Sequence, residues 1–371
     1  MLKIWFNRLK ATKNSYFDFS QFFKFLRFSS PFLASHATHR ACSECNALIV
    51  GAGPVGLRTA IELSLLGCNT VVVELREEFT RLNLVHLWKS AVADLKSLGI
   101  KKIFGQFCNG ELNHIAISKL QLCLLKLSLI AGVEVFTGTR YQTTRHPASQ
   151  QKPWKPTTQP ELPNSCPVKH RMDVLIGADG KETMIPGFDM KTLRGKLAIG
   201  LTVNFKNSQT ENEKSVEEIP GIGYQYKRPW FDKLKKIYNI GLENIVYYKN
   251  EHHYFVMTPK KESLLARGVF KQDHGDVSEL LSWKNIDKDR LEQYARDTVN
   301  YATNDKLKGC EFMINSRGQS DCGLFDFTSM WQAKHASITR QVNKYRQFSY
   351  LVKSVTHFIV LEFIICFASS M

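Results

Sequence analysis

The chain has 371 residues, of which 43% are hydrophobic, so it can bury a large core and is expected to form two domains rather than one. Its formal net charge of +16 favours an acidic partner, although positive charge spread over the surface for solubility explains it equally well. No run of Lys and Arg interleaved with aromatic residues is present, which argues against nucleic acid as that partner.

Residues 1–40 differ in composition from the chain that follows. They are rich in Phe, Ser and basic residues and contain a single acid, Asp18, which is typical of a transit peptide or of a poorly ordered leader. Cys42 and Cys45 form a C-x-x-C pair, but no second pair follows, so no metal site is expected. The nine irregularly spaced cysteines favour a reducing, intracellular compartment.

The first strong pattern along the chain is a β-α-β unit with a glycine-rich turn. A G-x-G-x-x-G motif alone is weak evidence, but between a strand and a helix it is typical of dinucleotide-binding folds. The unit comprises a strand at 46–50, the turn at 51–56, a helix at 57–67 and a second strand at 70–73 that ends at Glu74.

The residues of this turn suit a pyrophosphate-containing cofactor. Gly51 permits the tight turn, Gly53 lets the backbone approach the phosphates, and Gly56 lets the helix pack closely on the strand. The helix N-terminus then presents N–H groups to the anion. Glu74 stands where a carboxylate accepts hydrogen bonds from ribose hydroxyls, which predicts FAD or NAD rather than NADP.

Further elements extend this unit into a doubly wound parallel sheet. We expect helices at 84–98 and 115–131, strands at 133–136 and 173–177, and an exposed proline-rich excursion at 143–170. A turn with Asp179 and Gly180 follows the strand at 173–177. The residue pattern then changes to that of an α+β domain. We expect strands at 197–205, 244–248 and 254–258 and helices at 230–238 and 287–301.

The glycine turn, the Asp179-Gly180 turn and the β-rich second domain together resemble class A flavoprotein monooxygenases. Longer strings are similar to the monooxygenase domain of the MICAL family, in the order of that family, over roughly residues 41–352. They are 51–54, Glu74-x-Arg76, Arg81-x-Asn83-x-x-His86-Leu87-Trp88, 107–110, 114–117, 194–199, 242–249, 253–258 and 325–330.

The resemblance implies an FAD-binding Rossmann-like domain with an inserted α+β substrate domain. It implies FAD as cofactor, NADPH as co-substrate, and oxidation of methionine in F-actin, which promotes filament disassembly. It implies no membrane span and a cytoplasmic, cytoskeleton-associated protein, with mitochondria as the minority alternative because of residues 1–40. The implied divisions are a leader at 1–40, an FAD domain at 41–196 and 325–352, a substrate domain at 197–324 and an apolar tail at 353–371.

The resemblance also implies roles for individual residues. Glu74 and Arg76 would hold the adenosine ribose and a neighbouring phosphate, Arg81 and Asn83 would lie along the pyrophosphate and flavin, and Asp179 and Gly180 would lie near the pyrophosphate and ribose. His86 would lie at the flavin entrance, Tyr254 against the isoalloxazine, Tyr141 at the adenine, and Val55, where the family has Cys, would contact the cofactor through its backbone. Alternatively, His86 and Tyr254 are core residues, and Arg76 and Arg81 are solvated loop charges.

The chain departs from the family pattern at Lys353 and Ser354, where the family has Gly-Asp, a flavin-contacting pair. We therefore expect a chain truncated at its C-terminus, and two rival functions stay open. One is an NADPH oxidase that produces hydrogen peroxide, and the other is a catalytically inactive module that binds actin or another partner. The apolar stretch at 358–367 is too short for a membrane span and is interrupted by Glu362.

Overall fold

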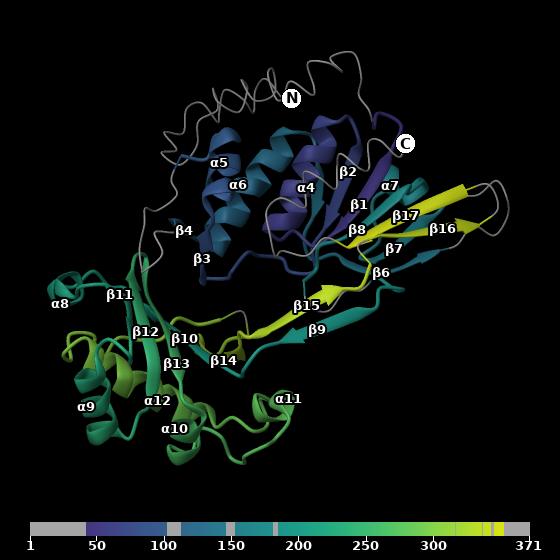
Figure 1. The fold of residues 1–371 in the computed structure, drawn as a ribbon. Coiled ribbons are helices and arrows are strands. Elements are labelled where there is room, and N and C mark those ends of the chain that lie inside the picture. Colours follow the sequence, from purple (N-terminus) through teal and green to yellow (C-terminus); the bar gives the residue numbers. More distant parts are fainter. Residues whose placement is uncertain are drawn as a thin grey trace. The chain divides into compact units, whose positions relative to one another are not determined.

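A computed structural model describes residues 42–101, 113–145, 153–180, 185–315, 317–335, 337–342 and 345–351 (Figure 1). The leader expected at 1–40, the string at 107–110 and the tail expected at 353–371 lie outside the described residues. The chain divides into two compact units: unit 1 contains the described residues up to 191 and from 332 onward, and unit 2 contains residues 192–331.

Unit 1 is built on a six-stranded sheet in the order β16-β17-β8-β1-β2-β5. All neighbouring strands are parallel except β16 and β17, which pair antiparallel. The strands are β1 (Asn46–Val50), β2 (Asn69–Val73), β5 (Glu134–Phe136), β8 (Val174–Gly177), β16 (Ser337–Val342) and β17 (Tyr345–Leu351). The sheet confirms the expected doubly wound class, with β1 at an inner position beside β2 and β8.

The alternation of side chains along β1 fills two separate cores. Ala47 and Ile49 belong to the cluster formed with helices α4 (Pro54–Leu65), α5 (Lys89–Ser97) and α6 (Ile117–Ile130). Leu48 and Val50 belong to the cluster on the opposite face of the sheet. Because successive side chains of a strand point to opposite faces, an all-apolar strand requires a cover on both sides.

The second face is covered by the segment in which the sequence predicted an exposed excursion. Its described part contains β7 (Lys155–Gln159), which pairs with β6 (Arg140–Arg145), and α7 (Pro167–His170). Trp154, Leu162, Cys166 and Val168 are each at most 3% exposed. The expectation of an exposed linker is therefore wrong for these residues, because the apolar sheet face must be buried.

Two helix starts differ from the sequence prediction by three residues or more. The helix predicted at 84–98 begins at Lys89, because the preceding residues form β3 (Leu84–Leu87), which pairs with β4 (Asn113–Ala116). The helix predicted to begin at Leu57 begins at Pro54 instead. Proline is well suited to the first helical position, where its missing N–H has no intrahelical partner.

Unit 2 contains a five-stranded antiparallel sheet in the order β11-β12-β13-β10-β14. The strands are β10 (Ile199–Lys206), β11 (Ile219–Gly223), β12 (Leu242–Lys249), β13 (His252–Pro259) and β14 (Cys322–Asp326). The helices are α8 (Glu211–Ser215), α9 (Arg228–Tyr238), α10 (Lys261–Ala266), α11 (Val277–Leu280) and α12 (Lys288–Ala302). A further pair, β9 (Met190–Arg194) and β15 (Ser329–Ala333), carries the chain from unit 1 to unit 2 and back.

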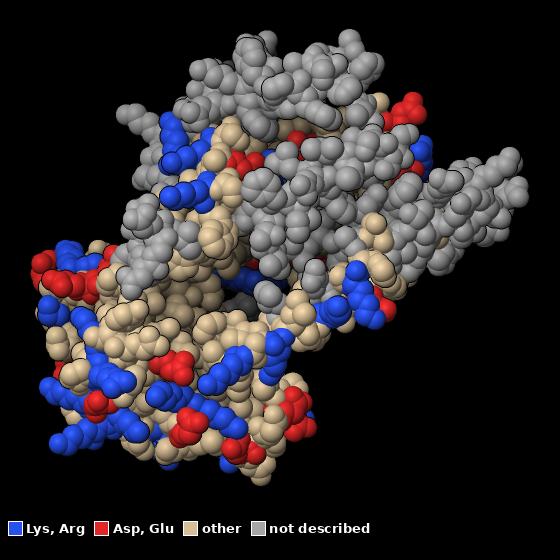
Figure 2. All heavy atoms as spheres, viewed as in Figure 1, with Lys and Arg blue, Asp and Glu red and all other residues tan. Residues whose placement is uncertain are grey.

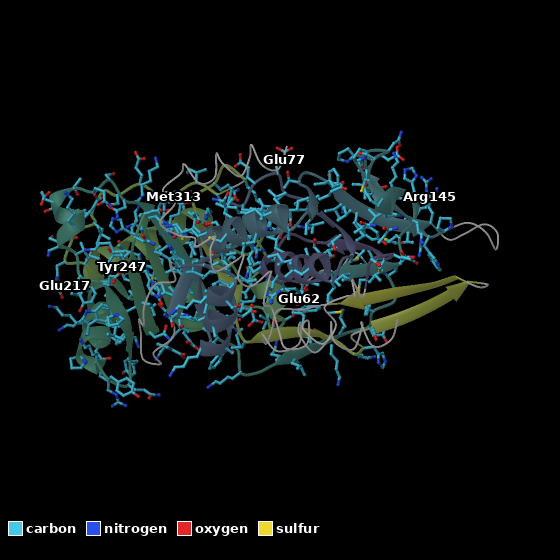
Figure 3. All side chains as sticks on the ribbon, turned by 90° about the horizontal axis from the view of Figure 1, so that it is seen from above. Glu62, Glu77, Arg145, Glu217, Tyr247 and Met313 are labelled. Carbon is cyan, nitrogen blue, oxygen red and sulfur yellow. The ribbon has the colours of Figure 1, made fainter. Side chains whose placement is uncertain are left out.

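Buried side chains from the sheet and the helices of unit 2 form its own core. Tyr247 of β12, labelled in Figure 3, is fully buried and stacks on Phe255 of β13 with ring centroids 4.3 Å apart. Leu291, Tyr294 and Val299 of α12 belong to the same cluster. Across the described ranges of both units, no helix has the length and apolar character needed to cross a bilayer.

The two sides of α6 provide a stability test with an internal control. Leu124 is 1% exposed within the core, whereas Leu122 on the same helix is 54% exposed. We expect Leu124→Ala to lower the free energy of unfolding by about 2–5 kcal/mol, because it leaves a cavity. Leu122→Ala should change it by less than about 0.5 kcal/mol. Urea denaturation followed by circular dichroism measures both, and equal losses would contradict the burial of Leu124.

Candidate functional site

The turn between β1 and α4 requires glycine at two of its three motif positions for reasons internal to the protein. Gly51 has a φ of +105°, and a Cβ there would lie 2.6 Å from the carbonyl oxygen of Ala178. A Cβ on Gly56 would lie 2.0 Å from the carbonyl oxygen of Gly51. These two glycines hold strand, turn and helix in close contact.

Gly53 differs from the other two glycines. Among the described residues, a Cβ built on Gly53 meets the carbonyl oxygen of Ala178 at 3.9 Å, which is an ordinary van der Waals distance. A small side chain would therefore fit at Gly53, and the packing of the described residues does not require glycine there. A backbone without a side chain is what close approach of a pyrophosphate needs.

The peptide groups of Ala52 are held from two sides. Its N–H donates to Oε2 of Glu74 at 2.8 Å, and its carbonyl oxygen accepts from Nε2 of Gln121 at 3.0 Å. The second carboxylate oxygen of Glu74 accepts from the N–H of Arg76 at 3.0 Å. These bonds fix the carboxylate of Glu74, at the end of β2, beside the turn.

Gln121 is a site residue that the sequence prediction missed. It lies on α6, is 5% exposed, and reaches across to the turn. A signal for it exists in the sequence, because it is a polar residue in a helix that is otherwise largely apolar. A buried polar side chain in such a helix needs a hydrogen-bond partner, and here the partner is the turn.

The N-terminus of α4 is available to an anion. Gly53 occupies the N-cap position, and within the described chain no side chain caps it and no acidic residue stands in the first turn. The first N–H groups of a helix have no intrahelical partner and carry the positive end of its dipole. Such a terminus is suited to bind phosphate.

The backbone of Asp179, which follows β8, lies beside the glycine turn. The N–H of Ala178 donates to the carbonyl oxygen of Val50 at 2.7 Å, and the backbone nitrogen of Asp179 lies 2.9 Å from where a Cβ on Gly51 would be. Gly180 follows with a φ of +88°. The structure thus brings the glycine turn, Glu74 and Asp179 together at the carboxyl ends of neighbouring parallel strands, where α/β sheets bind ligands.

The segment containing Arg81, Asn83 and His86 runs beside the start of α6. The carbonyl oxygens of Arg81 and Asn83 accept from the N–H groups of Ser118 at 3.2 Å and Ile117 at 2.9 Å. His86 is exposed on β3, opposite His114 of β4 in the register. Arg76 and Arg81 are exposed as well.

The three remaining candidates are packed among other side chains. Tyr141 is 2% exposed within the core on the second sheet face, with its hydroxyl 2.7 Å from Oγ1 of Thr144. Val55 packs against the core on the helix-covered face. Tyr254 is 4% exposed in unit 2, with its ring stacked on Tyr248. The structure thus gives Tyr141 and Tyr254 the surroundings of core residues.

Substitution by alanine distinguishes the packing at Gly56 from the packing at Gly53. We expect Gly56→Ala to destabilise the protein by about 3 kcal/mol, because the added methyl group meets backbone that cannot move away. Gly53→Ala should change stability by less than about 0.5 kcal/mol. Thermal unfolding of the two variants decides the matter, and equal melting temperatures would refute the close approach at Gly56.

Models of known protein families match parts of both units. The family model described as "Mical, Rossman domain" matches residues 197–326, and the model described as "FAD binding domain" matches residues 44–102. The first match covers the antiparallel sheet of unit 2, and the second covers the β-α-β unit of unit 1.

Curated relatives are similar over most of the described chain. The "Protein-methionine sulfoxide oxidase mical3b" of Danio rerio is 46% identical over 305 residues, which are 81% of this chain and 18% of the relative. The F-actin monooxygenase MICAL3 of Homo sapiens is 44% identical over 309 residues, 82% of this chain and 15% of the relative. The F-actin monooxygenase mical1 of Danio rerio is 45% identical over 305 residues, 82% of this chain and 25% of the relative.

A solved structure gives the same fold at low sequence identity. The ternary complex of aklavinone-11 hydroxylase with FAD and aklavinone matches with a TM-score of 0.50 and 14% identity, covering 83% of this chain and 56% of that chain. This chain thus spans between about one seventh and one quarter of the length of its curated relatives. Within that span, it belongs to the MICAL family of flavoprotein monooxygenase domains.

Proposed function

We propose that this chain binds FAD at the glycine turn and, with NADPH, oxidises methionine side chains of F-actin. The observation that carries the proposal is the cradle formed by the bare backbone at Gly53, the uncapped start of α4 and the carboxylate of Glu74. The names of the curated relatives support the substrate, since they describe F-actin monooxygenases and a methionine sulfoxide oxidase.

Each residue near the turn has a defined part in this proposal. The backbone at Gly53 and the first N–H groups of α4 receive the pyrophosphate, together with the side chains of Arg81 and Asn83. Glu74, fixed by Ala52, accepts hydrogen bonds from the adenosine ribose, and Arg76 lies near a phosphate. Asp179 and Gly180, whose turn lies beside Gly51, are near the pyrophosphate and ribose.

The roles of the remaining candidates are proposed from the family resemblance. Val55 contacts the cofactor through its backbone, and Tyr141 lies toward the adenine. His86 lies at the flavin entrance, and Tyr254 lies against the isoalloxazine. When bound, FAD would supply the redox chemistry, with NADPH as the electron donor and O₂ as the source of the oxygen, which no side chain can supply.

The basic side chains exposed by α9 suit an acidic filament in the cytoplasm. Elsewhere on the face of unit 2 shown in Figure 2, Lys and Arg are interspersed with Asp and Glu. The helix α9 alone exposes Arg228, Lys233, Lys235 and Lys236. A basic surface accelerates encounter with an acidic partner and makes the association rate sensitive to salt.

The carboxylate of Glu74 provides a direct test of cofactor binding. We expect Glu74→Gln to weaken FAD binding about 10-fold or more, because hydrogen bonds to a charged acceptor contribute about 1.5–3 kcal/mol. Glu78→Gln removes the same charge four residues away at an exposed position and should leave the affinity unchanged. Quenching of FAD fluorescence on titration with protein gives both affinities, and equal weakening would refute the role of Glu74.

The reaction is tested by supplying FAD-loaded protein with NADPH, O₂ and F-actin. We expect NADPH consumption to rise when F-actin is added, and mass spectrometry to find methionine sulfoxide in the actin even with catalase present. Peroxide equal to the NADPH consumed, regardless of actin, would instead identify an NADPH oxidase. Binding to sedimented filaments without any turnover would identify an inactive binding module.

A further inference from the structure

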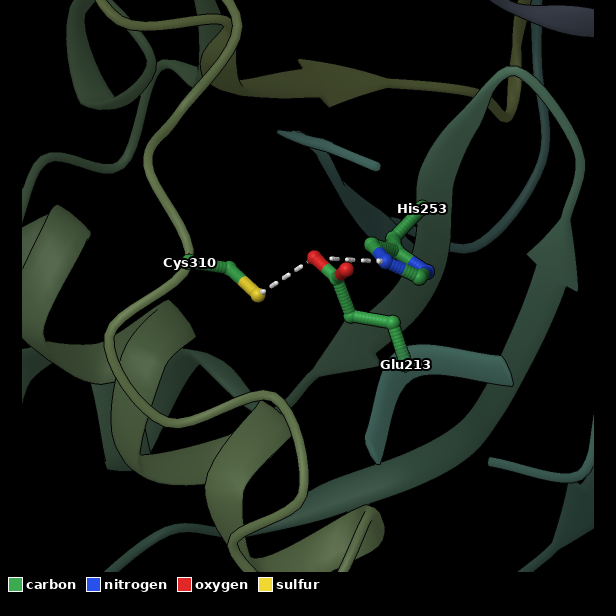
Figure 4. A group of neighbouring side chains, drawn as sticks. All are labelled: Glu213, His253 and Cys310. Carbon is green, nitrogen blue, oxygen red and sulfur yellow. Dashed lines mark hydrogen bonds and ion pairs between the residues drawn. The ribbon is translucent and has the colours of Figure 1, made fainter. Parts of the chain in front are cut away.

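Three side chains that the proposed function does not use converge inside unit 2 (Figure 4). They are Glu213 of α8, His253 of β13 and Cys310, which follows α12. One ligand atom from each lies within 4.8 Å of the other two. Oε1 of Glu213 is 3.6 Å from Nε2 of His253 and 3.4 Å from Sγ of Cys310.

The imidazole of His253 has an unsatisfied atom that points into this cluster. His253 is fully buried, and its Nε2 has no hydrogen-bond partner among the described residues. The nearby oxygen of Glu213 lies beyond hydrogen-bond distance. Buried polar atoms without a protein partner are rare, and such an atom is suited to bind a water molecule or an ion.

The other nitrogen of the ring is held by Tyr247. Nδ1 of His253 lies 2.8 Å from the Tyr247 hydroxyl. When Nδ1 donates its proton to that hydroxyl, Nε2 presents a lone pair toward Glu213 and Cys310. Burial lowers the pKa of His253 despite the neighbouring carboxylate. In metal-binding histidines a hydrogen bond commonly holds the second ring nitrogen, as Tyr247 does here.

Glu213 is held in place by the backbone of its own helix start. Oε2 accepts from the N–H of Thr210 at 2.7 Å, and Oε1 accepts from the N–H of Ser208 at 3.2 Å. Burial raises the pKa of Glu213, but these hydrogen bonds outweigh it and lower the pKa to about 2. The hydrogen bonds therefore hold the carboxylate in one orientation, although the residue is only 3% exposed.

We propose that Glu213, His253 and Cys310 bind a zinc ion, with water in a fourth position. Zinc bonds of about 2.0–2.3 Å in a tetrahedron place ligand atoms about 3.3–3.6 Å apart. The two distances from Glu213 are already of that size, so only the thiol and imidazole need to approach each other. A thiolate together with imidazole selects zinc over magnesium or calcium.

Charge and proton balance are consistent with this site. Burial, together with the hydrogen bond to Glu213, raises the pKa of Cys310 to about 11, so the free thiol is protonated at neutral pH. On binding, the thiol loses its proton to solvent and a zinc–sulfur bond forms without any change of oxidation state. One carboxylate and one thiolate then neutralise the two charges of the ion. Cys310 is only half-buried, which gives the ion a way in.

The ion would tie together three elements that are distant in the sequence. α8, β13 and the segment after α12 each contribute one ligand, so zinc would stabilise unit 2. A metal that binds the folded state but not the unfolded chain raises the melting temperature with its concentration. This site shares no residue with the proposed FAD cradle, so either can fail without the other.

Cobalt is a spectroscopic probe for the site in the full chain after removal of metal. We expect one equivalent of Co²⁺ to give a thiolate-to-cobalt charge-transfer band that equimolar Zn²⁺ abolishes. Cys310→Ser should remove the band, while Cys123→Ser, the half-buried cysteine of α6 in unit 1, should leave it unchanged. A band that survives in Cys310→Ser, or no band in the unaltered chain, would overturn the proposal.

Tyr247→Phe tests the orientation of the imidazole and should weaken cobalt binding about 10- to 100-fold, as substitutions of other residues that hydrogen-bond metal ligands do.

If Cys310→Ser fails to fold, two measurements on the unaltered protein test the zinc site instead. Zinc should protect Cys310 from alkylation by iodoacetamide, read by mass spectrometry, and should raise the melting temperature. Unchanged labelling with no shift would show a hydrogen-bonded cluster without metal.

Discussion

The geometry of the candidate site depends on the close contact between the turn after β1 and the chain around it. Gly51 lies against the backbone of Ala178 and Asp179, and Gly56 lies against Gly51, so that no side chain fits at either place. The peptide of Ala52 is fixed between Glu74 and Gln121. These contacts restrict the conformation of the turn, and the proposed cradle for a pyrophosphate requires such a restriction.

The constraint extends outward to both faces of the sheet. Residues of β1 alternate between the core under α4 and α6 and the core under β7 and α7. Gln121 joins the first core to the turn, because the helix that packs on the sheet also donates to Ala52. Packing and site geometry are therefore coupled through α6, and displacement of this helix would also displace the turn.

The sequence predicted correctly those parts of the structure that are formed by residues close together in the chain. Strands, helix and turn from Asn46 to Glu74 follow from hydrophobic spacing and from glycine positions, and the parallel sheet follows from them. The prediction for the proline-rich segment was wrong, because proline indicates turns while the burial of Leu162 and Cys166 depends on a sheet face formed by strands distant in the sequence. Sequence reasoning likewise could not find Glu213, His253 and Cys310, since no spacing rule joins residues so far apart.

Binding of FAD at the turn around Gly53 and Glu74 is tested most directly by the absorbance spectrum of the purified chain. After incubation with FAD and gel filtration, we expect both flavin bands to elute with the protein at about one flavin per chain. A protein that stays colourless while its circular dichroism shows a folded state would contradict this expectation, because the folded turn would then not bind the proposed cofactor.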